Sequence, residues 1–269
     1  MNMKMDMKKE KLKIGVFGIT GCAGCLLSVL YEDLFLEFTE LLDVKSYPLV
    51  KQDKYEGNFD IVFLEGTVTY KDDIEMLKKL REKTKILVAL GTCSCLGGVP
   101  TIRNFMDKDR LRNIVYPKVG YMSNIKPEPI DRYVKVDYYI PECPPNKREI
   151  SDFIKEILLG RKPLLYNKPV CVECKNRENL CLLEVNEACL GPITRGGCDA
   201  ICPSNKIGCY GCRGKIDDAN MDRFIKLLGE KGYSLDEIKK RMEVFSGIEF
   251  IENGKIDQVR SFGKGRGSC

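Results

Sequence analysis

The 269-residue sequence contains neither histidine nor tryptophan. Any metal site in this protein must therefore take its ligands from other residue types. The charges are nearly balanced, with 44 Lys and Arg against 39 Asp and Glu and a net charge of +5. A basic block occurs only in the N-terminal segment "MNMKMDMKKEKLK", and aromatic residues that could stack on bases are not interleaved with basic ones. The composition therefore does not indicate a nucleic acid as partner.

Long apolar runs are also missing. The longest, such as "KILVAL", are far shorter than the roughly 20 residues needed to span a bilayer, so we expect no membrane span. Residues 1–11 lack the apolar stretch and the arginine pair of an export signal, which predicts a disordered leader and a cytoplasmic protein. In that reducing compartment the 14 cysteines are expected to bind metal and not to form disulfides.

Short apolar, β-branched runs alternate with amphipathic segments over the first 160 or so residues. The runs predict strands at 12–18, 44–50, 59–66, 84–91 and 136–143. The amphipathic segments predict helices at 24–42, 72–83 and 147–159. This alternation predicts an α/β fold, a flavodoxin-like, doubly wound parallel sheet in a domain of residues 12–162.

Cysteines follow three of the predicted strands, in "GITGCAGC", "GTCSCLGG" and "PECPP". The carboxyl ends of parallel strands meet at one edge of a sheet, where such folds form their ligand crevice. The nearby glycines allow the backbone to approach a ligand closely. We therefore expect one site with four thiolates: Cys22, Cys25, Cys93 and Cys143. Cys95 is interpreted as a packing residue, with its exchange for Cys93 as the alternative.

Residues 163–250 have a different pattern. Eight cysteines occur in the 42 residues from Cys171 to Cys212, with almost no periodicity, so bound metal must organise this segment. Two helices are predicted after it. Asp217 or Asp218 is expected to cap the first helix, and Ser234 with Glu237 forms a capping box for the second. Residues 251–269 are expected to be a tail.

The eight cysteines divide in chain order into two sets of four. The sets are Cys171, Cys174, Cys181 and Cys189, followed by Cys198, Cys202, Cys209 and Cys212. Their spacing suits zinc and iron–sulfur clusters about equally. The third site, in the α/β domain, favours iron–sulfur clusters, because three sites of one ligand type indicate an electron-transfer chain.

The segments "GCAGC", "EGT", "GTCSCLGG", "ECPP", "CLGPITRGGC" and "GCYGC" occur in this order along the chain. This ordered set, over residues 12–245, resembles the small subunit of [NiFe] hydrogenases. It is most similar to the cytoplasmic archaeal type, the sulfhydrogenase delta subunit and the F420-non-reducing hydrogenase small subunit. The resemblance implies that the set with Cys22 holds a proximal [4Fe-4S] cluster, the set from Cys198 a medial one and the set from Cys171 a distal one.

Some relatives use a histidine at the distal site and only three cysteines at the medial site. This chain has no histidine, and Cys202 supplies a fourth medial thiolate, so we expect three all-cysteine [4Fe-4S] clusters. Glu142 stands where glycine is usual, and Asn146 where proline is common. The resemblance also puts Glu65 near the proximal cluster. The alternative for Glu65 is a solvated carboxylate at a strand end.

The function that the resemblance implies is electron transfer. A large subunit would activate hydrogen at a nickel–iron site, and no residue of this chain is expected to be catalytic. The clusters would pass electrons to an acceptor, either a diaphorase or an iron–sulfur adaptor leading to heterodisulfide reductase. Two alternatives stay open: a hydrogenase-like subunit whose large partner lacks nickel–iron, and a zinc-binding scaffold. The related complex I subunit would lack the second cysteine segment.

Overall fold

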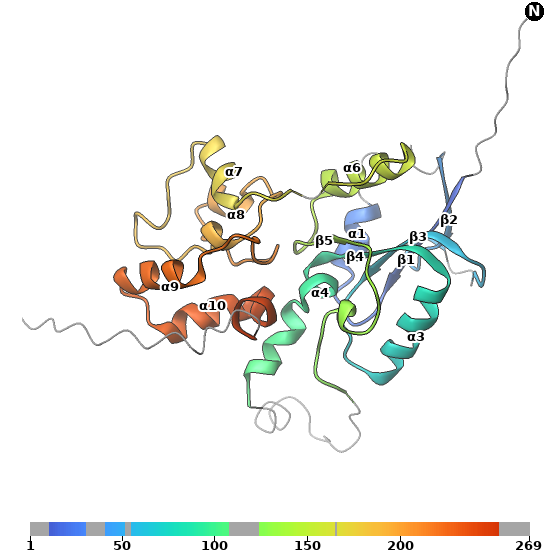
Figure 1. The fold of residues 1–269 in the computed structure, drawn as a ribbon, viewed down its shortest axis with the longest axis horizontal. Coiled ribbons are helices and arrows are strands. Elements are labelled where there is room, and N and C mark those ends of the chain that lie inside the picture. Colours follow the sequence, from blue (N-terminus) through green and yellow to red (C-terminus); the bar gives the residue numbers. More distant parts are fainter. Residues whose placement is uncertain (1–10, 31–40, 52–54, 108–123, 165, 253–269) are drawn as a thin grey trace, which may run out of the picture.

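A computed structural model of the protein describes residues 11–30, 41–51, 55–107, 124–164 and 166–252 (Figure 1). Nearly all of the predicted leader and of the tail lies outside these ranges, as does the middle of the helix predicted at 24–42. The chain forms two parts, a sheet covered by helices and a helical part rich in cysteine (Figure 1).

The first part contains one sheet of five strands, in the order β2-β1-β3-β4-β5, with every neighbouring pair parallel. This is the strand order of a flavodoxin-like doubly wound sheet, so the predicted fold class is confirmed. The strands are β1 (Leu12–Gly18), β2 (Leu42–Ser46), β3 (Phe59–Glu65), β4 (Thr84–Leu90) and β5 (Tyr138–Ile140).

Several predicted boundaries were wrong. The second strand begins at Leu42, so the predicted helix cannot extend to that residue. The same strand ends at Ser46, because the chain turns at Tyr47, whose backbone oxygen accepts from Val50 and Lys51. The fifth strand is also shorter than predicted, at three residues.

Helices cover both faces of the sheet (Figure 1). One face packs against α1 (Gly24–Leu30) and α6 (Lys147–Leu158), the other against α3 (Lys71–Glu82), α4 (Gly91–Leu96) and the short turn η3 (Ile130–Arg132). Side chains alternate between the faces, as strand geometry requires. Phe63 packs against Phe153 of α6, with ring centroids 5.8 Å apart, whereas the adjacent Val62 and Leu64 join Leu77 of α3.

The second part has its own core, centred on Leu190, Ile225 and Met242. Its elements are α7 (Val170–Asn176), η4 (Gly191–Ile193), α8 (Ile201–Ser204), α9 (Met221–Glu230), α10 (Leu235–Gly247) and η5 (Ile248–Glu252). α10 packs against α4 and against η1 (Val99–Phe105) of the first part. The two parts therefore share an interface.

Of the two helix caps predicted in the second part, the cap of α10 is confirmed and the cap of α9 was wrong. Ser234 and Glu237 form the expected capping box of α10. Asn220, and not Asp217 or Asp218, caps α9, accepting from the Arg223 backbone at 3.0 Å. Asp217 instead pairs with Arg195 at 2.9 Å.

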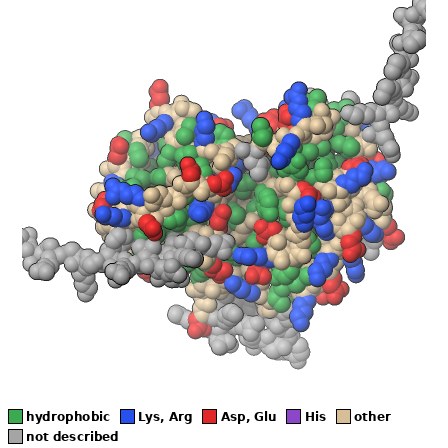
Figure 2. All heavy atoms as spheres, in the orientation of Figure 1, with side chains coloured by type: hydrophobic (Ala, Val, Ile, Leu, Met, Phe, Trp, Pro, Cys, Tyr) green, Lys and Arg blue, Asp and Glu red, His purple; other side chains and the backbone are tan. Residues whose placement is uncertain are grey.

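The surface carries both signs of charge. Figure 2 shows positive and negative side chains interspersed over both parts of the molecule on the face that it draws. This mixture matches the near balance of charges in the sequence. In the described ranges, every helix is too short or too polar to cross a bilayer.

Candidate metal centres

Four cysteines gather at the carboxyl edge of the sheet. Cys22 follows β1, Cys25 lies in the first turn of α1, Cys93 lies in α4 and Cys143 follows β5. Burial raises the pKa of the Cys25 thiol, and so does repulsion from the nearby acidic groups Glu65, Cys93, Cys143 and Cys22. Cys25 is buried, whereas Cys22 and Cys143 are exposed. The group expected to be proximal therefore lies together and opens to the surface.

Glu65, the last residue of β3, holds the loop that carries two of these thiols. One of its oxygens accepts from the backbone of Ala23 at 2.7 Å, and the other from Leu26 at 3.0 Å. Ala23 has a φ of +62°, a conformation that costs energy for a residue with a side chain. Glu65 is only 2% exposed, so it is not a solvated strand-end carboxylate.

Glycines allow the backbone to approach these sulfurs. A Cβ at Gly91, which has a φ of +83°, would overlap Cys25 Sγ. A Cβ at Gly98 would lie 2.7 Å from Cys93 Sγ. Each glycine therefore leaves a space beside a thiol that no other residue type would leave.

Cys93 and Cys95 have different surroundings although they lie in the same short helix. Burial, together with repulsion from Cys143, raises the pKa of Cys93 to about 11. Cys95 is 4% exposed, its thiol donates to the backbone oxygen of Ala89 at 3.3 Å, and it packs in the core on the α3 face. Its position is consistent with the packing role expected of it.

Four further cysteines line one cavity of about 390 Å³. They are the set expected to be medial: Cys198, Cys202, Cys209 and Cys212. The other walls are mostly apolar, from Val170, Ile201, Pro203, Val244 and Phe245, while Glu142, Cys143 and Arg213 line the side toward the sheet. Burial raises the pKa of Cys198 and Cys209 to about 12.

The set expected to be distal adjoins this cavity. Cys171 and Cys174 lie in α7, Cys181 is exposed and Cys189 is buried. Burial raises the pKa of Cys171 to about 12, with added repulsion from Cys189, Cys174 and Cys181. The backbone of Cys209 donates to Cys189 Sγ at 3.3 Å, so the two sets meet there.

The thiols of the three cysteine groups are suitable ligands for iron–sulfur clusters. Each group offers four thiolates, and a [4Fe-4S] cluster takes one thiolate on each of its four irons. Thiolates that bind such a cluster therefore do not converge on a single ion. Within the described part of the chain, no three His, Cys, Asp or Glu side chains are arranged to share one metal ion.

Arg213 lies between the first two groups of cysteines. It is 2% exposed and binds two carboxylates, Glu142 at 2.8 Å and Glu149 at 2.7 and 2.8 Å. Burial raises the pKa of Glu142 to about 7, although Arg213 opposes the shift. Glu142 is itself buried, and a buried carboxylate requires a cation nearby, which Arg213 supplies.

Comparison with known proteins agrees with the resemblance to hydrogenase subunits that the sequence motifs indicate. The sequence pattern of the family described as NADH ubiquinone oxidoreductase, 20 Kd subunit, matches residues 22–157. The chain is 35% identical to sulfhydrogenase 2 subunit delta of Pyrococcus furiosus, over 87% of this chain and 99% of that protein. It is 36% identical to a vhu-type F420-non-reducing hydrogenase subunit from Methanocaldococcus jannaschii, over 77% of this chain and 83% of that protein.

Two solved structures resemble the fold. One chain of an NAD⁺-reducing [NiFe]-hydrogenase in the H₂-reduced state is 31% identical, with a TM-score of 0.52 over 57% of this chain and 94% of that one. A chain of the Ni-Fe-Se hydrogenase from Desulfomicrobium baculatum is 18% identical, with a TM-score of 0.50 over 76% of this chain and 94% of that one. The second likeness concerns the fold alone.

Proposed function

Because this chain belongs to the family of the NADH ubiquinone oxidoreductase 20 Kd subunit, and with it to the hydrogenase subunits of the sulfhydrogenase delta type, we propose that it is the electron-transfer small subunit of a [NiFe] hydrogenase. It relays electrons between a nickel–iron site in a large subunit and an acceptor subunit. Hydrogen is activated in the partner, and this chain supplies the path for electrons.

The observation that carries the proposal is the arrangement of twelve cysteines in three adjoining groups. The first group meets the second at the cavity of the second group, which Cys143 lines together with Cys212. The second meets the third where the Cys209 backbone donates to Cys189. Adjoining groups would favour electron transfer between the clusters that they hold, because tunnelling rates fall steeply with the distance between two clusters.

The three groups would hold three [4Fe-4S] clusters, which supply one-electron redox chemistry when bound. Cys22, Cys25, Cys93 and Cys143 would hold the proximal cluster, the set from Cys198 the medial one and the set from Cys171 the distal one. Glu65 orders the loop of the proximal site through its two backbone hydrogen bonds. We place the complex in the cytoplasm, with a diaphorase or an iron–sulfur adaptor to heterodisulfide reductase as acceptor.

The test is the metal content of protein purified without oxygen, together with its response to hydrogen. About twelve irons per chain are expected. In the complex with its large partner, hydrogen should reduce the clusters and bleach the visible absorbance. About four irons with stoichiometric zinc would overturn the assignment of the cysteine-rich part. Reduction by dithionite but not by hydrogen would favour a partner that lacks nickel–iron.

A further inference from the structure

The junction between the two parts of the molecule is built around one arginine. Arg213 directly follows Cys212, and its side chain reaches back to the turn that carries Cys143. Its Nε donates to the backbone oxygen of Gly196 at 2.6 Å. Its two terminal nitrogens bind Glu142 and Glu149 of the first part. The guanidinium group therefore joins three segments that lie far apart in the sequence.

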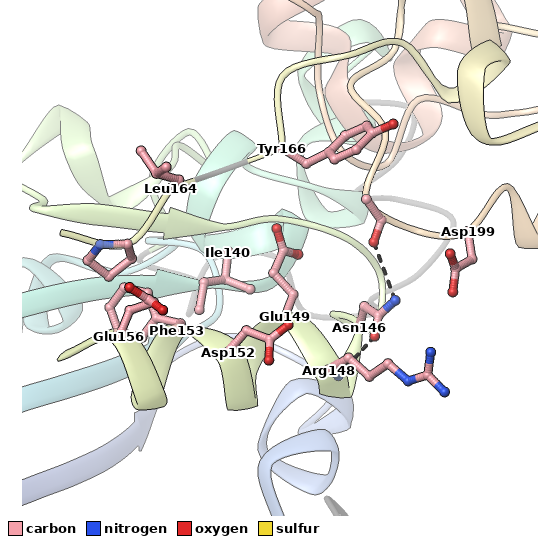
Figure 3. Close-up of a pocket in the computed structure, with 12 residues that line it drawn as sticks. Ile140, Asn146, Arg148, Glu149, Asp152, Phe153, Glu156, Leu164, Tyr166 and Asp199 are labelled. Carbon is pink, nitrogen blue, oxygen red and sulfur yellow. Dashed lines mark hydrogen bonds between the residues drawn. The ribbon is translucent and has the colours of Figure 1, made fainter. Parts of the chain in front are cut away.

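Other contacts leave the guanidinium group little freedom to move. A Cβ at Gly197 would lie 2.8 Å from Arg213 Cζ, so the loop passes directly against it. Asn146, the N-cap of α6, donates to the Gly197 backbone oxygen at 3.3 Å, drawn dashed in Figure 3. Glu149 lies on the same helix, beside a cavity of about 290 Å³ along the junction (Figure 3).

The cysteines on either side of this arginine belong to different groups. Cys143 is expected at the proximal site and Cys212 at the medial site, and both line one cavity together with Arg213. Glu142 precedes the first cysteine and Arg213 follows the second, and their side chains are paired at 2.8 Å. This ion pair therefore fixes the two cysteine loops against each other.

We propose that Arg213 is a positioning residue for electron transfer, which sets the separation of the proximal and medial sites by clamping the Cys143 turn to the Cys212 loop. This inference rests on the proposed function, since it concerns two of the proposed clusters. The clamp needs the planar fork of arginine, which binds Glu149 in a bidentate manner and still reaches Glu142 and Gly196. A lysine carries the same charge but cannot make this set of bonds.

The experiment compares Arg213→Lys with the matched control Arg195→Lys, both in the complex with the large partner. Arg195 lies in the same part and pairs with the exposed Asp217 at 2.9 Å. Iron content is measured first. The magnetic interaction between neighbouring reduced clusters is then recorded by EPR, because it depends on their separation and not on overall stability. Freeze-quenched samples give the rate at which the medial cluster is reduced after hydrogen is added.

Arg213→Lys should keep about twelve irons. Its magnetic interaction should differ from that of the wild type, and medial reduction should be about tenfold slower, while Arg195→Lys should match the wild type. Wild-type interaction and rate in Arg213→Lys would overturn the inference and leave the proposed function intact. A wild-type protein without three clusters would overturn the proposed function itself.

A second variant keeps the proposal testable if Arg213→Lys does not fold. Glu149→Gln retains Arg213 and its bonds to Glu142 and Gly196, but loses one charged partner of the fork. Its magnetic interaction should differ from that of the wild type in the same direction as in Arg213→Lys, but by a smaller amount. If Arg213→Lys does not fold and Glu149→Gln matches the wild type in both measurements, the clamp does not set the separation of the sites.

Discussion

The hydroxyl of Thr92 donates to the backbone oxygen of Cys212 at 2.6 Å, linking residues 120 positions apart in the sequence. The backbone of Thr92 also donates to the Glu142 backbone oxygen at 3.0 Å. A single buried threonine thus ties the helix of Cys93 to the loops of Cys143 and Cys212. The groups expected at the proximal and medial sites are connected through backbone atoms as well as through the ion pairs of Arg213.

Replacing Thr92 by valine should destabilise the junction. Valine preserves the shape of the side chain but leaves the Cys212 carbonyl without this donor, at a cost of about 1–3 kcal/mol. The thermal midpoint should fall, and the segment that joins α6 to α7 should become more sensitive to protease. Thr194→Val is the control, since its hydroxyl donates to Leu190 within the second part at 2.7 Å. Equal protease sensitivity of the two variants would show that Thr92 has no special role at the junction.

Gly197→Ala should displace the Arg213 side chain. Gly197 has a φ of +107°, which is unfavourable for alanine, and its new Cβ would overlap the guanidinium group. The strain of the backbone alone costs about 1–3 kcal/mol. Gly232→Ala controls for that strain, because Gly232 has a φ of +93° and an added methyl group there would meet no atom within 4 Å. The thermal midpoint should therefore fall further for Gly197→Ala, and equal losses would contradict the steric argument.

The sequence was sufficient to predict that four cysteines lie at one edge of the sheet. Cys22, Cys25, Cys93 and Cys143 follow strands of a parallel sheet, whose carboxyl ends must share an edge. The burial of Glu65 was not visible in the sequence, because it depends on hydrogen bonds to the backbone of Ala23 and Leu26 across two strands.

Pairings between distant segments could not be predicted either. Arg213 meets Glu142 and Glu149 only because the second part packs against β5 and α6. The pattern of apolar residues along the sequence does not indicate that contact. The cap of α9 was missed for a similar reason. Asp217 is a good capping residue, but Arg195 pairs with it in the folded protein.

Glu249 should make stability depend on pH. Burial raises the pKa of Glu249, although the Lys215 backbone donates to its carboxylate at 2.6 Å. Above about pH 4.5 the unfolded state loses this proton while the folded state keeps it, so stability falls as pH rises toward the folded pKa. Glu249→Gln should lose this part of the pH dependence, because an amide does not titrate in this range. Its amide oxygen can still accept from the Lys215 backbone, so the hydrogen bond itself is retained. The test is to measure the thermal midpoint of the wild type and of Glu249→Gln at several pH values above 4.5. The same change of midpoint with pH in both proteins would contradict the prediction.

Cys93 and Cys95 provide a matched pair of substitutions in α4. Cys93→Ser should lose about four irons per chain, because a proximal cluster would lose one of its ligands. Cys95→Ser should keep all of its iron, since the thiol of Cys95 donates to Ala89 inside the core. It should still lower the thermal midpoint, because serine places a more polar group among apolar neighbours. Loss of iron in Cys95→Ser alone would show that Cys95 and not Cys93 is the ligand.

Cys202 tests how the eight cysteines of the second part divide. It lines the cavity with Cys198, Cys209 and Cys212, yet after burial and Glu142, repulsion from Cys189 of the neighbouring set contributes to raising the pKa of Cys202. If Cys202 belongs to the medial site, Cys202→Ser leaves three thiolates there, and the expected product is a [3Fe-4S] cluster.

The iron content of Cys202→Ser should then fall from about twelve to about eleven per chain. An EPR signal of oxidised [3Fe-4S] should be present in the variant and absent from the wild type. The three irons of such a cluster are all ferric when it is oxidised, so it is reduced more easily, and the medial site would retain electrons and slow their transfer to the acceptor. Reduction of the proximal cluster by hydrogen should change little, because its four cysteines are untouched. If the variant instead loses the cluster held by Cys171, Cys174 and Cys181, then Cys202 is a distal ligand and Cys189 takes its place at the medial site.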